Sequence, residues 1–130
     1  MKKNCLNCNI EYNARRSVYK YCSNSCQADF QYKQYISEWL DGNQTGNKGE
    51  KSLQLSDYVR RYLHDINGTA CSKCGWDEKH PVDGRTLTEV DHIDGNASNS
   101  TLNNLRILCP NCHSMTTTFR ARNKQSSRER

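Results

Sequence analysis

The sequence has 130 residues and a hydrophobic fraction of 34%, whereas typical soluble domains reach about 45 to 50%. This length predicts one domain, or one small domain with a still smaller accessory module, and the shortage of apolar residues means that burial alone does not hold the fold together. No apolar run is long enough for a membrane span or a signal peptide, so we expect a cytoplasmic protein whose cysteines are reduced.

The net charge of +5 is unevenly distributed along the chain. Residues 1–35 and 114–130 each carry +4, whereas residues 36–70 carry −1 and residues 71–113 carry −2. Basic ends suit a polyanion such as nucleic acid, and a local acidic excess suits a divalent cation. Solvated basic tails are the simpler alternative.

Two short-range cysteine pairs, Cys5 with Cys8 and Cys22 with Cys26, open the chain. Each pair supplies two thiolates from one turn, and the intervening loop brings the pairs together, as a tetrahedral zinc ion requires. In a reducing compartment this spacing favours zinc over disulfides. The pattern predicts a small module that resembles a zinc ribbon.

Residues 10–21, between these pairs, interleave aromatic and basic side chains and predict a small hairpin. Arg15, Arg16 and Lys20 can contact phosphate while the tyrosines stack on bases. The alternative is that the aromatic residues simply form the core of the module.

Apolar residues at helical spacing predict one helix over residues 28–40 and another over residues 55–67, the second capped by Ser56 and ended by Gly68. Between the helices lies a stretch rich in Gly and Asn, which is typical of a linker. We therefore expect four segments: an N-terminal zinc module with a helix over 1–41, a linker over 42–50, a second domain over 51–122, and a disordered basic tail over 123–130.

A second set of cysteines, Cys71, Cys74, Cys109 and Cys112, predicts a second zinc site that clamps the 34 residues between its two pairs. Inside the clamp the sequence predicts a strand over 86–90, a polar loop over 94–101 and a strand over 105–108. A helix over 114–122 is expected to follow.

The segment from Glu89 to Asn96, together with the segment from Leu102 to His113, closely resembles the HNH endonuclease motif. The resemblance covers about residues 69–122, and its three letters fall on His92, Asn104 and His113. It implies a small zinc-stabilised α+β fold of the ββα-metal class, also called the His-Me finger, with a four-cysteine zinc clamp.

The residues themselves suit phosphodiester hydrolysis. Asp91 offers a hard oxygen ligand, and His92, with a reference pKa of about 6.5, can accept a proton from water. Adjacent side chains of a strand point to opposite sides, so the two need not compete. The resemblance implies that Asp91 and His113 bind a catalytic divalent ion such as Mg²⁺ or Mn²⁺, that His92 is the general base, and that Asn104 fastens the loop.

Simpler roles remain open for several of these residues. His92 can be an ordinary histidine at a strand end, and His113 can replace a cysteine at the zinc, although four thiolates already fill that site. Glu89 lies on the same face of the strand as Asp91 and can orient a ligand. Plain loop polarity is the favoured interpretation for three residues, Asp94, Asn96 and Asn99.

The resemblance implies double-stranded DNA as the partner. Basic side chains are the candidate phosphate contacts: Arg15, Arg16, Lys20, Arg106, Arg120, Arg122 and Lys124. We therefore expect a metal-dependent DNA endonuclease with two structural Zn²⁺ ions, similar to phage enzymes of homing or DNA packaging that act in the host cytoplasm. Cleavage of both strands would need a second site from a homodimer, or a second encounter. As protein partners, a homodimer and a packaging protein both stay open. The alternative is a non-catalytic DNA-binding regulator with two zinc sites, and an RNA nuclease is disfavoured because no platform for stacking single-stranded bases stands out.

Overall fold

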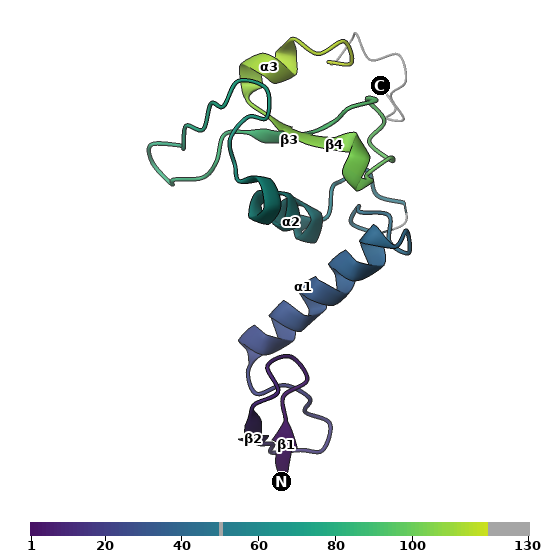
Figure 1. Cartoon of the computed structure of the whole chain (residues 1–130), viewed down its shortest axis with the longest axis vertical. Helices are drawn as coiled ribbons and strands as arrows, with labels where there is room; N and C mark the ends of the chain where they lie inside the picture. The colour runs from purple at the N-terminus through teal and green to yellow at the C-terminus, as the bar shows by residue number, and fades with distance from the viewer. Residues whose placement is uncertain (50, 120–130) are drawn as a thin grey trace. The chain divides into compact units, whose positions relative to one another are not determined.

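The computed structural model describes residues 1–49 and 51–119 and divides into two compact units, residues 1–38 and a second unit that begins at Trp39 (Figure 1). The first unit holds β1 (Lys2–Asn4), β2 (Glu11–Asn13) and most of α1 (Asn24–Leu40). The second holds α2 (Asp57–Asn67), β3 (Glu89–His92), the 3₁₀ helix η1 (Leu102–Asn104), β4 (Leu105–Leu108) and α3 (Pro110–Ser114). The predicted small α+β class is confirmed.

In the first unit β1 and β2 pair antiparallel around the first cysteine turn, with Lys3 opposite Tyr12. The amide of Asn9 donates to the carbonyl of Cys5 at 2.9 Å, and the amide of Cys5 donates to the carbonyl of Ile10 at 2.9 Å. Asn9 adopts a φ of 63°, a left-handed conformation that Asn tolerates better than most residues. The hairpin therefore forms across the cysteine turn itself, and not within residues 10–21 as the sequence pattern predicted.

Both predicted long helices are present. α1 begins at Asn24, four residues before the predicted start, because the Ser23 hydroxyl accepts a hydrogen bond from the amide of Cys26 at 3.1 Å. In α2 the Ser56 hydroxyl accepts from the amide of Tyr58 at 3.2 Å, and Gly68 ends the helix at a φ of 75°. The predicted cap and stop of the second helix are confirmed.

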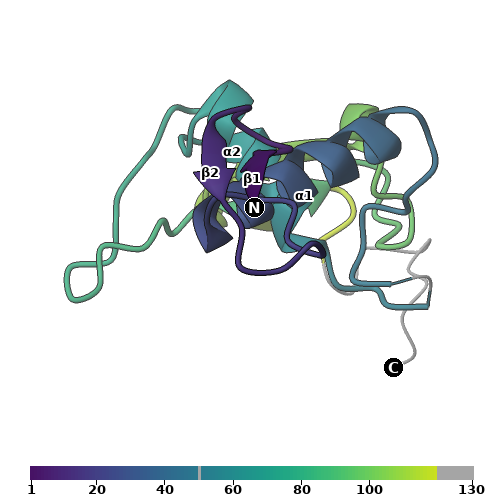
Figure 2. The ribbon, with the colours of Figure 1, turned by 90° about the horizontal axis from the view of Figure 1, so that it is seen from below.

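The second unit is centred on the antiparallel pair β3 and β4, in which Asp91 lies opposite Arg106 and His92 lies opposite Leu105. Leu108 and the α2 residues Val59 and Leu63 are fully buried. In both ribbon views the loop that leads from the Cys74 turn to β3 extends away from the rest of this unit (Figures 1 and 2).

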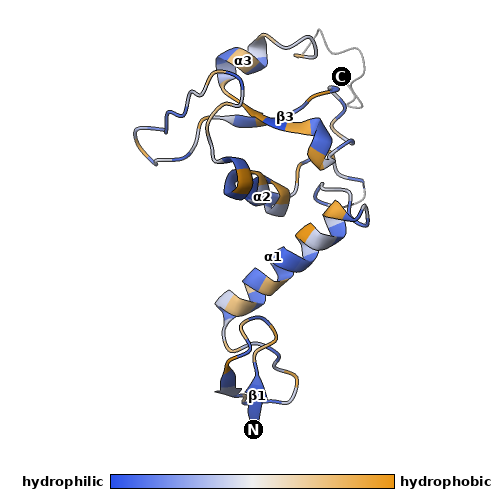
Figure 3. Cartoon of the chain, in the orientation of Figure 1, coloured by the Kyte–Doolittle hydropathy of each residue, from blue (hydrophilic) through white to orange (hydrophobic). Residues whose placement is uncertain are grey.

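The hydrophobic segments of both units are short and are separated by hydrophilic ones (Figure 3). In the second unit Cys71 and Cys109 pack directly with Leu108, and Trp76 packs against this group. The cysteines are thus part of the core, as the low hydrophobic fraction of the sequence requires. Across the described ranges, no helix combines the length and apolarity needed to cross a membrane.

Part of the segment predicted as a linker, residues 42–50, packs inside the second unit. Asn47 is 5% exposed, and its side-chain amide donates to the carbonyl of Ala97 at 3.1 Å. The amide of Ser56 donates to the carbonyl of Gly46 at 2.8 Å. The division into units falls between Glu38 and Trp39, and the proposed boundaries at 41, 50 and 122 remain predictions.

The helix predicted over 114–122 is wrong for its described part. α3 starts earlier, at Pro110, and ends at Ser114, and residues 115–119 form turns. The Thr116 hydroxyl donates to the carbonyl of His113 at 2.9 Å and so competes with helix continuation, which the three consecutive β-branched threonines disfavour as well. Residues 120–122 and the tail lie outside the described residues.

Candidate active site and metal centres

The eight cysteines form two clusters, and within each cluster the four sulfur atoms lie within 4.8 Å of one another. A tetrahedral zinc ion with bonds of about 2.3 Å separates its sulfur ligands by about 3.8 Å. Observed Sγ to Sγ distances are 3.7 Å for Cys8 with Cys22, 3.5 Å for Cys22 with Cys26, and 3.6 Å for Cys74 with Cys109. Both clusters therefore suit structural zinc.

The thiols of the second cluster differ in how easily they ionise without a metal. Burial raises the pKa of Cys71, but hydrogen bonds from the backbones of Cys109 and Cys74 outweigh it and lower the pKa to about 6. A hydrogen bond with the Cys109 side chain, followed by burial, raises the pKa of Cys112 to about 12. A bound dication stabilises all the thiolates together, so the donor set fits an ion of charge +2.

The second cluster also ties together the elements that carry the candidate active site. Both the amide and the hydroxyl of Ser72 donate to the carbonyl of Ile107 on β4, at 2.8 Å each. The amide of His113 donates to the carbonyl of Cys109 at 2.8 Å. Hydrogen bonds from the two turns of the second cysteine cluster thus fix the position of β4 and the start of α3.

Asp91 of β3 and His113 of α3 lie close together. Asp91 Oδ1 lies 3.4 Å from His113 Nε2, and the Asp91 side chain is 8% exposed. One divalent ion with ligand bonds of about 2.1 Å holds adjacent ligand atoms about 3 Å apart, so the two donors can share an ion. Glu89 Oε2 lies 3.3 Å from His113 Nδ1, which leaves Nε2 to face Asp91.

Arg106 pairs with Asp91 across the β3–β4 ladder. Its Nε donates to Asp91 Oδ2 at 2.9 Å, opposite the oxygen that faces His113. The directly opposed register of the two residues places them at the distance of a cross-strand pair. Arg106, predicted as a DNA contact, is thus engaged in holding the carboxylate, and its contact with DNA remains a prediction.

Asn104 joins the two ends of the loop after β3. Its amide nitrogen donates to Asp94 Oδ1 at 2.9 Å and to the carbonyl of Asn99 at 2.7 Å, and its amide oxygen accepts from the backbone of Asp94 at 3.0 Å. Hydrogen bonds from the side chain of Asn99 and the backbone of Asn96 hold the pKa of Asp94 below its usual value. Asp94 is therefore a structural anchor of the loop in this arrangement.

His92 faces the same loop. Its Nε2 lies 2.9 Å from the hydroxyl of Ser100. Ser100 is 1% exposed, and its hydroxyl donates to Asn47 Oδ1 at 2.6 Å. The ring is therefore held at one nitrogen by a buried hydroxyl.

Residues 71–119 match the HNH endonuclease family. They form an HNH endonuclease domain. The H-N-H endonuclease F-TflIV of Escherichia phage T5 is 38% identical over 97 residues, which are 75% of this chain and 39% of that enzyme. The chain thus spans about two fifths of the length of this relative. No solved structure matches the chain.

The HNH domain brings together Asp91 and His113, and it places His92 at the end of β3 and Asn104 at the end of η1, on either side of the adjoining loop. Arg15, Arg16 and Lys20 lie exposed in the first unit. Three other predicted DNA contacts lie outside the described residues: Arg120, Arg122 and Lys124.

Sequence reasoning missed two residues near the HNH motif, Ser100 and Asn47. Both are small polar residues in loops rich in the same types, so no periodicity distinguishes them. Burial in a polar loop is the property that sets them apart, and it becomes visible only in the fold.

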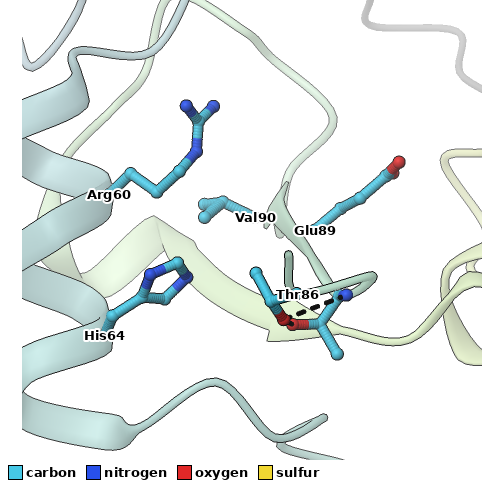
Figure 4. A pocket seen from close by; sticks show the side chains of 6 residues that line it. Arg60, His64, Thr86, Glu89 and Val90 are labelled. Atoms are coloured by element: carbon cyan, nitrogen blue, oxygen red, sulfur yellow. Dashed lines mark hydrogen bonds between the residues drawn. The ribbon is translucent and has the colours of Figure 1, made fainter. Parts of the chain in front are cut away.

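A pocket of about 400 Å³ lies between α2 and β3, and Glu89 is one of its lining residues (Figure 4). Arg60 and His64 project from α2 toward Val90, whereas Glu89 points away from the helix (Figure 4). Alternation along the strand thus separates the helix-facing side of β3 from the side that carries Glu89 and Asp91.

Proposed function

We propose that the protein is a metal-dependent DNA endonuclease that hydrolyses phosphodiester bonds in duplex DNA. The observation that carries this proposal is the 3.4 Å approach of Asp91 Oδ1 to His113 Nε2 inside the HNH domain. A regulator that only binds zinc and DNA does not need these two donors at one point. The relative from phage T5 is itself named an H-N-H endonuclease.

Asp91 and His113 are proposed to hold the catalytic ion, for which Mg²⁺ and Mn²⁺ are the candidates. Bound there, the ion supplies positive charge for the phosphate and the leaving oxygen. Glu89 orients His113 through Nδ1, and Arg106 holds the second oxygen of Asp91. These two contacts set the direction of both ligands before metal arrives.

His92 is the proposed general base, which takes a proton from the attacking water. Asn104 keeps the loop beside it closed through hydrogen bonds to Asp94 and Asn99. Rigid placement of the base is a large part of what this chemistry requires, because water, phosphate and ion must be aligned.

Two structural zinc ions are proposed, one in each four-cysteine cluster. The zinc at Cys109 and Cys112 would hold the turn from which His113 projects, since the amide of His113 bonds to the carbonyl of Cys109. Structural zinc would thus contribute to activity through the fold and not through the reaction.

Affinity for DNA is proposed to come in part from the first unit. Its exposed cations are joined by exposed side chains of Val18 and Tyr19, 68% and 46% exposed, which therefore do not serve as core. A pocket of about 680 Å³ includes Tyr19, Lys20 and Tyr21 in its lining. Aromatic and basic side chains at one place suit contact with bases and phosphates.

The relative comes from a bacteriophage, which supports a phage origin for this protein. Action in the host cytoplasm and a part in homing or DNA packaging are proposed together with that origin. A single active site would nick one strand. A break in both strands would then need a homodimer or a second encounter.

The direct test is incubation of supercoiled plasmid with the zinc-loaded protein and Mg²⁺, Mn²⁺ or Ni²⁺. Wild-type protein should convert the plasmid to nicked or linear forms, and EDTA and His92→Ala should abolish the conversion. His80→Ala, which changes an exposed histidine outside the HNH motif, should cleave normally. Full cleavage by His92→Ala would overturn the assignment of the base, and DNA binding without cleavage under every condition would favour the regulator.

A further inference from the structure

A chain of three hydrogen bonds leads from His92 to a backbone carbonyl. His92 Nε2 lies 2.9 Å from Ser100 Oγ, Ser100 Oγ lies 2.6 Å from Asn47 Oδ1, and Asn47 Nδ2 lies 3.1 Å from the carbonyl oxygen of Ala97. Ser100 and Asn47 are 1% and 5% exposed. The chain is therefore shielded from water over most of its length.

The direction of every bond follows from its fixed end. A backbone carbonyl can only accept, so the Asn47 atom beside Ala97 must be the amide nitrogen. The Asn47 oxygen then faces Ser100, whose single hydroxyl proton goes to this oxygen at 2.6 Å or to the more distant carbonyl of Ala97 at 3.4 Å. With that proton committed, Ser100 Oγ can only accept from His92, so His92 Nε2 must carry a hydrogen.

The reverse arrangement is unfavourable. If Ser100 donated to His92, its oxygen and the oxygen of Asn47 would face each other at 2.6 Å with no hydrogen between them. Both groups are buried, and an unsatisfied buried acceptor is costly. Thus one tautomer of the neutral ring is selected.

We propose that Ser100 and Asn47 are positioning residues that hold His92 as the Nε2–H tautomer, with the lone pair on Nδ1 to receive a proton from water. This inference rests on the proposed function, in which His92 is the general base. Neutral imidazole has one donor and one acceptor nitrogen, and the partner of one nitrogen decides the role of the other. The protein thereby presents the correct nitrogen before substrate binds.

The position of Ser100 is fixed by a segment outside the matched HNH region. Trp39 Nε1 donates to the carbonyl of Ser100 at 2.7 Å, and Gly46 lies so close that an added Cβ would meet the same carbonyl oxygen at 2.5 Å. Trp39, Gly46 and Asn47 all precede residue 71. Residues 39–47 therefore complete the surroundings of a base that the HNH motif supplies.

Two variants of the full-length, zinc-loaded protein test the proposal. Ser100→Ala removes the acceptor for His92 Nε2–H. Asn47→Ala removes the nearer acceptor of the Ser100 proton, so that His92 then competes for this proton only with the carbonyl of Ala97 at 3.4 Å. Ser98→Ala is the matched control, since Ser98 is an exposed serine of the same loop whose hydroxyl bonds to Asn96 at 2.7 Å. Thermal transitions identify any variant that fails to fold.

Two-bond ¹H–¹⁵N correlation spectra, recorded without a catalytic metal at a pH where His92 is neutral, report the tautomer directly. Wild-type and Ser98→Ala proteins should show Nε2–H. Asn47→Ala should shift part of the population toward Nδ1–H, because the carbonyl of Ala97 at 3.4 Å still competes for the Ser100 proton. A wild-type spectrum of the Nδ1–H form would overturn the proposal whether or not the protein cleaves DNA. The tautomer of the wild-type protein can be measured in this way even if a variant does not fold.

Plasmid cleavage supplies the second readout. Ser100→Ala should lower kcat about 10- to 100-fold with little change in KM, the size found when a partner of a site residue is removed. An unchanged kcat, or a loss confined to KM, would overturn the positioning role. A wild-type protein that shows Nε2–H and cleaves no DNA would refute the nuclease assignment and leave the hydrogen-bond chain intact.

Discussion

Gly46→Ala is expected to be strongly destabilising because two independent costs fall on one methyl group. Gly46 has a φ of +83°, and the added Cβ would lie 2.5 Å from the carbonyl oxygen of Ser100 and 2.7 Å from Trp39 Nε1. Both distances are shorter than non-bonded atoms tolerate. The methyl group must therefore separate Trp39 from Ser100, whose hydrogen bond is 2.7 Å long and buried.

The magnitude follows from these contacts. A left-handed φ costs a residue with a Cβ about 1 to 2 kcal/mol, and an unpaired buried donor or acceptor costs about 1 to 3 kcal/mol. The free energy of unfolding should fall by about 2 to 5 kcal/mol. Gly42→Ala is the matched control, since Gly42 has a φ of +86° with no atom within 4 Å of the added Cβ and should lose only the backbone part, about 1 to 2 kcal/mol.

Urea titration of the zinc-loaded proteins, followed by far-ultraviolet circular dichroism and tryptophan fluorescence, measures both values. The fluorescence of Trp39 should change in Gly46→Ala and stay close to wild type in Gly42→Ala. Equal losses in the two variants, within about 0.5 kcal/mol, would refute the reasoning, because the contact of Gly46 with Ser100 would then carry no energy.

Four further outcomes are expected. Removing zinc with a strong chelator should abolish both the cooperative thermal transition and plasmid cleavage, because structural zinc supplies about 10 to 16 kcal/mol in small modules, and a zinc-free protein that keeps both would contradict this. Arg106→Ala should lower kcat about 10- to 100-fold by releasing Asp91, whereas an effect on KM and salt dependence alone would assign Arg106 to DNA. Burial, and then the charge of Arg60, lower the pKa of His64. The contribution of neutral His64 to the free energy of unfolding should therefore be fully present above about pH 6.5 and be lost as the pH falls through the folded pKa. Urea titrations at several pH values should show this loss in wild-type protein and not in His64→Gln. Arg15, Arg16 and Lys20 are exposed, and replacing all three by alanine should reduce the salt slope of DNA binding by up to about three at unchanged kcat. An unchanged slope would exclude these three residues as phosphate contacts.

The sequence predicts well those features that depend on the type and spacing of a few neighbouring residues. Cysteine pairs with two or three residues between their members predict the two clusters, and Ser56 and Gly68 predict both ends of α2. Periodicity predicts β4, and the alternation of Glu89 and Asp91 places both on the side of His113. Each of these signals acts within a few residues of its source.

The features that the sequence does not predict depend on contacts between distant segments. Asn47 resembles every other Asn in a polar stretch, and its burial follows from a hydrogen bond to a residue 50 positions later. Trp39 continues the helical pattern of α1, so no local signal separates it from Ile36. The backward pairing of β2 with β1 likewise depends on closure of the cysteine turn, which spacing alone does not orient.

The dependence of Ser100 on residues 39–47 limits how the HNH domain can be transplanted. A chimaera joined at residue 51 would carry both proposed metal ligands and the proposed base, yet it would leave behind Trp39 and Asn47. A fusion junction between Glu38 and Trp39 retains them, although it cuts through α1. The segment that must be transferred as one piece is therefore longer than the matched HNH region, which begins at residue 71.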